Sequence, residues 1–349
     1  MSREERKLRK HLEAHTRREL RKALSKARVK EWKPPRERVN INEEEDYLPP
    51  LKKKTRTEQD APVSTGFVAE TGPGFCDVQS AGERVRCRYA GDVAVGDQVL
   101  FSPDRRRIEN VLPRRTTLSR ADPHNPRLER VIAANVDVVV NVVSLKSPPL
   151  RPGLIDRYLI AIGKSGAEPL VCINKIDLLS GAEELDPLRP YQDIGIPVIL
   201  CSAAEGIGLE ALSEALAGKL CVFAGHSGVG KSSLLNALDP HLQITTGSVS
   251  GANEKGRHTT TSSALYHLPN GAIVIDTPGI REFGLWDVTP DDLRRYFKEF
   301  DACQCAFSDC THTHEPDCSV KQALTSGAIS SARYESYARI LASLDRPTP

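Results

Sequence analysis

The stretch from Gly225 to Ser232 carries the residue types and the spacing that bind nucleotide phosphates. It reads G-H-S-G-V-G-K-S, follows the apolar run 220–224 and precedes an apolar helical pattern. Glycines there let backbone N–H groups surround the phosphates, and the positive end of the following helix adds to the attraction. We expect Lys231 to reach the β- and γ-phosphate oxygens and the Ser232 hydroxyl to bind Mg²⁺. The predicted phosphate contacts are Gly225, His226, Ser227, Gly228, Val229, Gly230, Lys231, Ser232 and Ser233.

Two further segments have the residue types that read a guanine base. Asn174-Lys175-Ile176-Asp177 closes the apolar run 170–173, and Ser202-Ala203 follows the run 198–200. The Asp177 carboxylate can accept hydrogen bonds from N1–H and N2–H₂ of guanine, which adenine cannot supply, and leaving a buried carboxylate unmet is costly. A backbone N–H of the second segment would reach guanine O6. The predicted guanine contacts are Asn174, Lys175, Ile176, Asp177, Ser202 and Ala203.

A third segment, Asp276-Thr277-Pro278-Gly279, ends the strand-like run 272–275. A carboxylate at that place can hold the Mg²⁺ shell, and the Gly279 N–H can sense a γ-phosphate. Because this segment lies downstream of a phosphate loop, the three segments together predict a site for Mg²⁺ and GTP.

The order of these segments along the chain is unusual. In ordinary small GTPases the phosphate loop comes first, whereas here 174–177 and 202–203 precede 225–232, and 276–279 comes last. The same sheet can form if the chain enters it at a different strand, because circular permutation needs only neighbouring ends and exposed loops. The residues after Gly279 then lead directly into the C-terminal part of the chain.

Four of the nine cysteines lie within sixteen residues, which in a reducing compartment indicates a metal site. Cys305, Cys310, His312 and Cys318 supply three thiolates and an imidazole, the set of a closed tetrahedral structural zinc site. Cys303 and His314 lie close enough to replace one of them. Residues 302–319 contain almost no aliphatic side chains, so we expect zinc to hold this segment folded.

The elements that must position these residues are short strands and helices. Near-continuous apolar runs at 136–143, 170–173, 198–200, 220–224 and 273–275 alternate with helical patterns, which predicts a mostly parallel sheet. Five evenly spaced β-rich runs between residues 65 and 111 predict a small barrel. A helix is expected to start at Thr289-Pro290, and a last one near 331–344.

Charge is distributed unevenly along the 349 residues. Residues 1–40 hold 15 Lys/Arg and 6 Asp/Glu, net +9, whereas the other 309 residues hold 33 and 40, net −7. A basic arm on a mildly acidic body is typical of a segment that binds a polyanion such as RNA, or of a solvated terminus. No apolar run reaches the ~20 residues of a membrane helix, and no secretory h-region is present. We therefore expect a cytoplasmic, monomeric protein with no membrane contact.

The permuted order, together with the motifs at 256–261 (G-R-H-T-T-T) and 276–283 (D-T-P-G-I-R-E-F), resembles the ribosome small subunit-dependent GTPase A family over about residues 62–345. The resemblance implies late maturation of the 30S subunit, contact with 16S rRNA, and GTP hydrolysis that the subunit stimulates. It implies a multidomain α/β fold, whose expected parts are an OB-type β-barrel (62–115), a circularly permuted P-loop GTPase domain with a mostly parallel sheet (116–286) and a zinc-binding helical C-terminal domain (287–349). A basic extension and linker (1–61) precede these parts, and the family pattern does not require an arm of this length.

Catalysis needs a group that orients the attacking water, and Ile280 occupies the position where a glutamine often does so. His258 is the nearest candidate in sequence and the one that the resemblance indicates, although it could instead face phosphate or RNA. The catalytic candidates are thus His258 and Lys231. Thr260 is the predicted switch ligand of Mg²⁺, with Thr259 and Thr261 as rivals.

RNA contacts are expected on the barrel, where arginines are frequent and aromatic residues few. This composition favours recognition of RNA shape and phosphates over reading of bases. The arginines are Arg84, Arg86, Arg88, Arg105, Arg106 and Arg107.

Three functions fit the sequence. The first is a GTPase of 30S assembly whose slow hydrolysis the subunit accelerates. The second is a GTP-gated RNA-binding checkpoint module with incidental hydrolysis, which Ile280 leaves open. The third is a signalling switch unrelated to ribosomes, against which the basic arm, the barrel and the zinc module all weigh.

Overall fold

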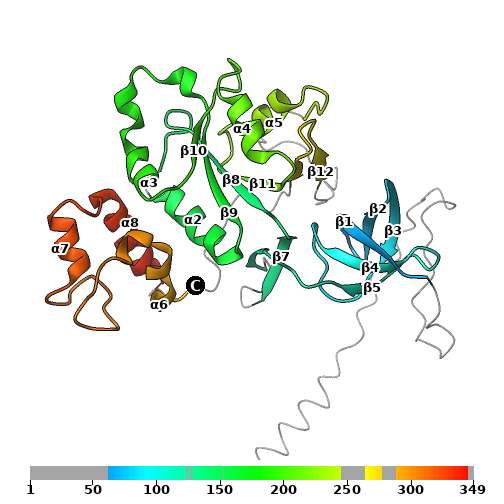
Figure 1. Ribbon diagram of the computed structural model, residues 1–349, viewed down its shortest axis with the longest axis horizontal. Coiled ribbons are helices and arrows are strands. Elements are labelled where there is room, and N and C mark those ends of the chain that lie inside the picture. Colours follow the sequence, from blue (N-terminus) through cyan, green and yellow to red (C-terminus); the bar gives the residue numbers. More distant parts are fainter. Residues whose placement is uncertain are drawn as a thin grey trace, which may run out of the picture. The chain divides into compact units, whose positions relative to one another are not determined.

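The computed structural model describes residues 62–122, 125, 128–151, 153–244, 264–276 and 288–344. The basic arm 1–61, the His258 and Thr259–Thr261 segment, and Gly279 with Ile280 therefore lie outside the described residues. The described part contains a barrel, a six-stranded sheet with its helices, and a C-terminal module, which we define as residues 288–344 (Figure 1). None of the helices described is long and apolar enough to cross a bilayer.

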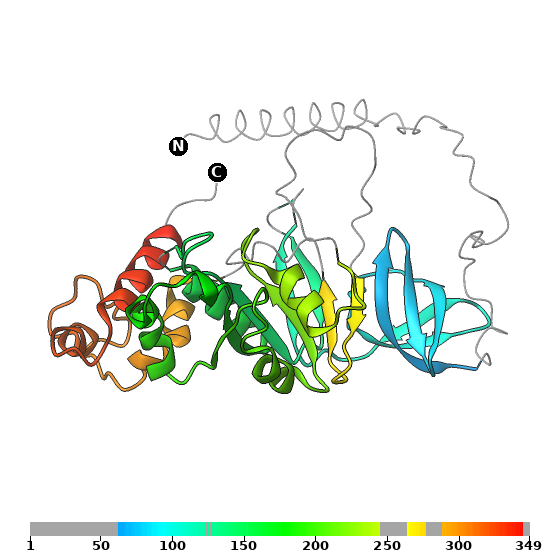
Figure 2. The same ribbon diagram turned by 90° about the horizontal axis from the view of Figure 1, so that it is seen from above.

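The predicted barrel is present and closed. Its strands follow the spatial order β1-β2-β3-β5-β4, and β4 pairs with β1 to complete the circle. The barrel strands are the blue and cyan arrows of Figure 2. Alternate side chains point inward, so that Val68, Val78, Val99 and Phe101 fill the interior. The strands are β1 (Ser64–Gly72), β2 (Phe75–Ser80), β3 (Glu83–Arg88), β4 (Gln98–Ser102) and β5 (Arg107–Val111).

A hairpin that the sequence patterns did not predict follows the barrel. It consists of β6 (Thr117–Ala121) and β7 (Glu129–Ala134), which pair antiparallel. The end of β7 is bonded to the barrel, because the Ala134 N–H donates to the Val95 carbonyl at 2.9 Å. The hairpin therefore ties the barrel to the chain that enters the sheet.

The central sheet has the predicted parallel strands in the order β10-β9-β8-β11-β13-β12, and only β12 runs antiparallel. All residues of β8 and β11 are buried, as continuous apolar runs in central parallel strands require. The edge strand β12 was not predicted. The strands are β8 (Val138–Val143), β9 (Glu168–Ile173), β10 (Val198–Leu200), β11 (Leu220–Ala224), β12 (Ala264–His267) and β13 (Ile273–Asp276).

Helices cover both faces of this sheet. Leu212 of α4 and Leu234 of α5 pack with Val140 on one face, whereas Tyr158 and Ile162 of α2 pack with β8 on the other. The bounds are α2 (Leu154–Ser165), α3 (Arg189–Asp193), α4 (Leu209–Leu216) and α5 (Lys231–Leu238), with 3₁₀ turns η2 (Ile176–Leu178) and η3 (Ala182–Leu188). This two-sided arrangement leaves the carboxyl ends of the strands open as one edge.

The C-terminal module differs from prediction at its start. Thr289 caps a helix as expected, accepting from the Asp292 N–H at 3.2 Å, but the backbone leaves helical geometry at Phe297 (φ −106°, ψ 79°). The break lets the rings of Phe297 and Phe300 both contact Tyr337, at 5.2 and 5.0 Å between centroids. The elements are α6 (Pro290–Leu293), η5 (Arg294–Tyr296), η6 (Lys298–Phe300), α7 (Ser319–Thr325) and α8 (Ser331–Leu344), the last as predicted.

We predict that Asn141→Val stabilises the protein. Asn141 is fully buried in β8, and neither amide atom has a hydrogen-bond partner among the described residues. An unmet buried amide costs about 1–3 kcal/mol, so its removal should raise the midpoint of thermal unfolding by a few degrees. The matched control is Asn135→Ala, since the Asn135 amide bonds Arg115 and Gly96 and its loss should lower the midpoint. A lower midpoint of thermal unfolding in Asn141→Val would contradict the finding that the Asn141 amide has no hydrogen-bond partner among the described residues.

Candidate functional site

The predicted nucleotide-binding segments that the structure describes follow strands at the carboxyl edge of the sheet. Residues 174–177 follow β9, residues 202–203 follow β10, and the phosphate loop 225–232 follows β11 (Figure 1). Because β8 alone separates β9 from β11, the guanine-reading and phosphate-binding segments lie on neighbouring parts of one edge. The permuted chain order thus still gives a single site.

The buried side chain of Asn174 joins the three segments. Its Nδ2 donates to the Val229 carbonyl of the phosphate loop at 2.9 Å, and its Oδ1 accepts from the Ala203 N–H at 3.1 Å. The amide approaches the loop so closely that a Cβ on Gly230 would lie 2.3 Å from Nδ2. Glycine is required there for that reason, and also because φ is +94°.

The two lysines of the site are both anchored to backbone carbonyls of the phosphate loop. Lys231 Nζ donates to the carbonyls of Gly225 (2.7 Å) and His226 (3.0 Å), which holds the ammonium inside the loop. Lys175 Nζ donates to the carbonyls of Gly228 and Ser147, each at 2.7 Å. The contact with Ser147 was not predicted, because no motif marks the loop after β8.

The Asp177 carboxylate is exposed at the edge of the site, not buried as the sequence-based prediction assumed, and it is oriented by its neighbour. Ser202 Oγ donates to Asp177 Oδ1 at 2.5 Å and accepts from the Glu205 N–H at 3.1 Å. The hydroxyl thereby fixes the rotamer of the carboxylate and leaves Oδ2 for a ligand. Asp276 ends β13, next to β11, so its backbone lies at the same edge.

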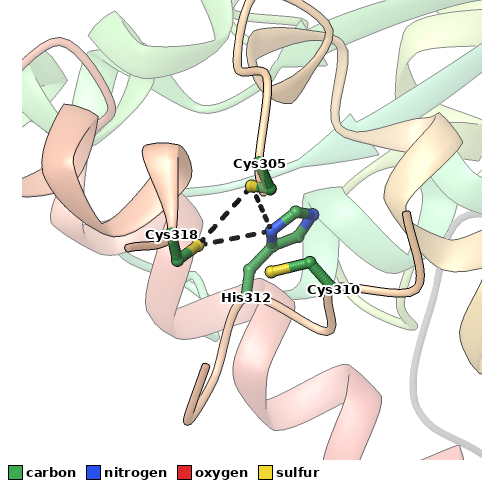
Figure 3. Close-up of side chains that lie close together, drawn as sticks. All are labelled: Cys305, Cys310, His312 and Cys318. Carbon is green, nitrogen blue, oxygen red and sulfur yellow. Dashed lines mark hydrogen bonds between the residues drawn. The ribbon is translucent and has the colours of Figure 1, made fainter. Parts of the chain in front are cut away.

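The four predicted metal ligands also come together. Their ligand atoms lie within 4.8 Å of one another, and the Nδ1 atom of His312 faces the sulfurs (Figure 3). Nδ1 lies 3.5 Å from the sulfurs of Cys305 and Cys318, which are 3.8 Å apart. In a tetrahedral zinc site, bonds of about 2.3 Å to sulfur and 2.0 Å to nitrogen give separations of about 3.5 and 3.8 Å. The cluster therefore fits zinc.

The electrostatics of the cluster suit a metal as well. Burial by itself raises the pKa of Cys305, but backbone N–H groups of Val320 and Ser319 and neighbouring thiols lower it below its ordinary value. Burial lowers the pKa of His312, so the imidazole is neutral at pH 7. Burial raises the pKa of Cys310 to about 12, so this thiol is protonated at neutral pH in the absence of a metal, and a metal that binds it would displace the proton to solvent.

Supports around the cluster were not predicted from the sequence. Glu315 accepts from the N–H groups of Thr311 (2.6 Å) and Thr313 (3.0 Å) and closes the ligand loop, by which we mean residues 305–318. Tyr334 and Tyr337 of α8 donate to the carbonyls of His312 (2.7 Å) and Thr311 (3.0 Å). The two tyrosines lie 22 and 26 residues after the carbonyls that they contact, so no local motif could indicate these bonds.

The arginines predicted to contact RNA lie on β3, on β5 and in the turn before β5. Arg84, Arg105 and Arg106 are exposed, while Arg86 pairs with Asp77 at 3.0 Å and lies over the ring of Phe75. Phe101 is buried in the barrel interior. The exposed arginines thus give the barrel surface positive charge, whereas the ring of Phe101 is not accessible for stacking on a base.

Comparisons with known proteins agree with this geometry. A profile of the RsgA GTPase family matches residues 111–286. The chain is 41% identical over 302 residues to the small ribosomal subunit biogenesis GTPase RsgA of Chlorobaculum parvum, covering 80% of this chain and 94% of that protein. It is 40% identical over 275 residues to the protein of that name from Thermotoga maritima, covering 75% of this chain and 90% of the relative.

Solved structures show the same fold. The crystal structure of YjeQ from Thermotoga maritima matches with a TM-score of 0.67 at 36% identity, over 82% of this chain and all of that one. YloQ, described as a circularly permuted GTPase, matches with a TM-score of 0.63 at 27% identity, over 84% of this chain and all of that one. With a family profile spanning half of the chain and relatives matched along at least nine-tenths of their length, this chain belongs to the RsgA GTPase family of circularly permuted GTPases.

Proposed function

We propose that this chain hydrolyses GTP to GDP and phosphate during late maturation of the 30S ribosomal subunit, with turnover stimulated by the subunit. The observation that carries the proposal is the Asn174 amide, which bonds the phosphate loop and the Ser202-Ala203 segment at once. One nucleotide bound at this edge would reach both. The name of the relatives, small ribosomal subunit biogenesis GTPase, supports the ribosomal role.

In this proposal the base is selected by Asp177. Its carboxylate, held by Ser202, would accept the N1–H and N2–H₂ groups of guanine. The other proposed base contacts are Asn174, Lys175, Ile176 and Ala203. Adenine would leave the carboxylate unmet, and such a mismatch discriminates strongly because a polar group loses its partner.

The phosphates would lie over residues 225–233. Lys231 would then donate to phosphate oxygens instead of the two loop carbonyls that it contacts in this structure. Ser232 and Thr260 would bind Mg²⁺, Asp276 would hold its water shell, and the Gly279 N–H would meet the γ-phosphate. His258 is our proposed orienting group for the attacking water. Since Ile280 cannot hydrogen-bond a water, we propose that contact with the subunit completes the site.

Zinc is the proposed structural metal of the C-terminal module, held by Cys305, Cys310, His312 and Cys318. All four positions are supplied by the protein, so zinc would keep the ligand loop folded and take no part in hydrolysis. The exposed arginines of the barrel would contact phosphates of 16S rRNA.

A second function, a GTP-gated RNA-binding checkpoint with incidental hydrolysis, is favoured by one residue. Ile280 removes the side chain that commonly orients water, so slow turnover would suffice for a protein that uses GTP only to set its affinity.

Replacing Asp177 tests the guanine contact. Asp177→Asn removes the acceptor pair for N1–H and N2–H₂ and offers an amide donor, which matches the C2 carbonyl of xanthine. GDP affinity should fall by roughly two orders of magnitude or more, and affinity for xanthosine diphosphate should rise. Competition against a fluorescent GDP analogue measures both. Asp186→Asn, at an exposed carboxylate paired only with Arg189, serves as the control; undiminished guanine preference in the first variant would exclude Asp177.

Removing zinc should unfold the C-terminal module while leaving the sheet intact. Cys310→Ser is expected to lose bound zinc and to expose the amides of residues 303–319 to hydrogen exchange, because few aliphatic side chains hold this segment. Cys303→Ser, which replaces a cysteine outside the cluster, should keep one zinc per chain. Equal zinc content in the two variants would refute this ligand set.

Turnover with purified 30S subunits separates the two functions. For an assembly GTPase, hydrolysis should rise by roughly two orders of magnitude or more, as when a partner completes a GTPase site. Ser232→Ala should hydrolyse no GTP in either condition, because Mg²⁺ loses a ligand. Phosphate release measured with and without subunits decides the matter, and unchanged wild-type turnover would favour the checkpoint.

A further inference from the structure

The segment between β8 and α2, residues 144–151, lies against the phosphate loop. Lys175 Nζ holds the Ser147 carbonyl and the Gly228 carbonyl together, each at 2.7 Å. The two segments also line a mostly apolar cavity of about 90 Å³, to which one segment contributes Pro148 and Leu150 and the phosphate loop contributes His226 and Val229. We call residues 144–151 the bridging segment, because its other end leads into α2.

Helix α2 packs on two different parts of the protein. Tyr158 and Ile162 belong to the core beneath the sheet, whereas Ile160 belongs to the core of the C-terminal module. The contact with α8 is close at the start of the helix, where a Cβ on Gly153 would lie 2.8 Å from Ser336 Oγ. The position of α2, and hence the end of the bridging segment, is therefore shared between the sheet and the module.

Arg333 of α8 forms ion pairs both with the first turn of α2 and with the C-terminal module. Its Nη1 donates to Asp156 Oδ1, and its Nε and Nη2 donate to the two oxygens of Glu299 at 2.6 and 3.0 Å. Tyr191 donates to the other oxygen of Asp156 at 3.2 Å. The guanidinium also lies over the ring of Phe297, 4.4 Å from its centroid. Arg333 and Asp156 are both nearly inaccessible to solvent.

The residue next to Arg333 reaches the zinc ligands. Tyr334 donates to the carbonyl of His312, so adjacent residues of one helix hold the ligand loop and the first turn of α2. Bonded and packed contacts thus run from His312 through α8, Asp156, α2 and the bridging segment to the Gly228 carbonyl of the phosphate loop. Pro152 lies outside the described residues, but the Leu154 N–H of α2 donates to the Arg151 carbonyl of the bridging segment at 3.1 Å. The route can therefore be followed through described contacts, and it does not involve the segment after Gly279.

We propose that Arg333 is a positioning residue for the nucleotide site: by holding Asp156, it sets the bridging segment against the phosphate loop and couples zinc binding in the C-terminal module to nucleotide binding. This inference rests on the nucleotide and zinc sites proposed above. A buried ion pair is a poor way to gain stability, since an apolar pair of similar volume does as well, but it fixes one geometry. That is the property a positioning contact needs.

Coupling of this kind is reciprocal. If zinc in the ligand loop favours the phosphate-binding arrangement, GDP must tighten zinc by the same factor as zinc tightens GDP. The factor is expected to be about fivefold or more, the lower end for coupled sites. A contact that only stabilises the fold would change neither affinity in the folded protein.

The test uses the full chain and two mild variants, Arg333→Lys and Asp156→Asn, with Arg339→Lys as a control on the exposed side of the same helix. Zinc affinity is measured by competition with a chromogenic chelator, with and without saturating GDP, and GDP affinity with a fluorescent analogue. We expect GDP to tighten zinc about fivefold in the wild type and in Arg339→Lys. In the two variants the effect should fall below about twofold, with weaker GDP binding and intact zinc stoichiometry.

Two results would overturn the proposal: zinc affinity independent of GDP in the wild type, or coupling that persists undiminished in Asp156→Asn. The second variant decides the matter if Arg333→Lys does not fold, because an asparagine retains the shape of the side chain. A wild-type protein that does not bind GDP would instead overturn the nucleotide site itself, and one that holds no zinc would overturn the metal site.

Discussion

The nucleotide site depends on one buried amide. Asn174 donates a hydrogen bond to the phosphate loop and accepts one from the Ser202-Ala203 segment. These two loops follow different strands, and the side chain fixes the distance between them. Without that side chain the Val229 carbonyl and the Ala203 N–H would each lose a partner, and an unmet buried polar group costs about 1–3 kcal/mol. The close approach of Gly230 belongs to the same arrangement. The spacing between the phosphate loop and the Ser202-Ala203 segment is thus set by the contacts of one side chain.

Because this contact joins strand ends rather than consecutive segments, the order of the strands along the chain matters little to it. Strand β8 lies between β9 and β11 whichever strand the chain enters first. Permutation changes what the ends of the domain are attached to. The barrel is bonded to β7, directly before β8, and α2 directly after β8 packs against the C-terminal module. The central strand is therefore flanked in sequence by both accessory parts.

The C-terminal module is held together by aromatic packing and polar contacts rather than by a large aliphatic core. Its core is aromatic, with Phe297 and Phe300 against Tyr337, and its ligand loop has almost no aliphatic side chains. Metal ligands and hydrogen bonds from α8 take the place of a larger core in holding the loop. The same helix carries Arg333, so the element that braces the ligand loop also meets the GTPase sheet through α2.

The sequence by itself determined the chemistry and much of the local structure. Residue types at fixed spacing identified the phosphate loop, the Asn174–Asp177 segment and the ligand set, and continuous apolar runs predicted the central strands, because these signals lie within a few residues. The structure decided what lies together: it left Cys303 and His314 out of the cluster and brought Lys175 to Ser147 and Arg333 to Asp156. Such contacts follow from strand order and helix packing, and no local pattern encodes partners 177 residues apart.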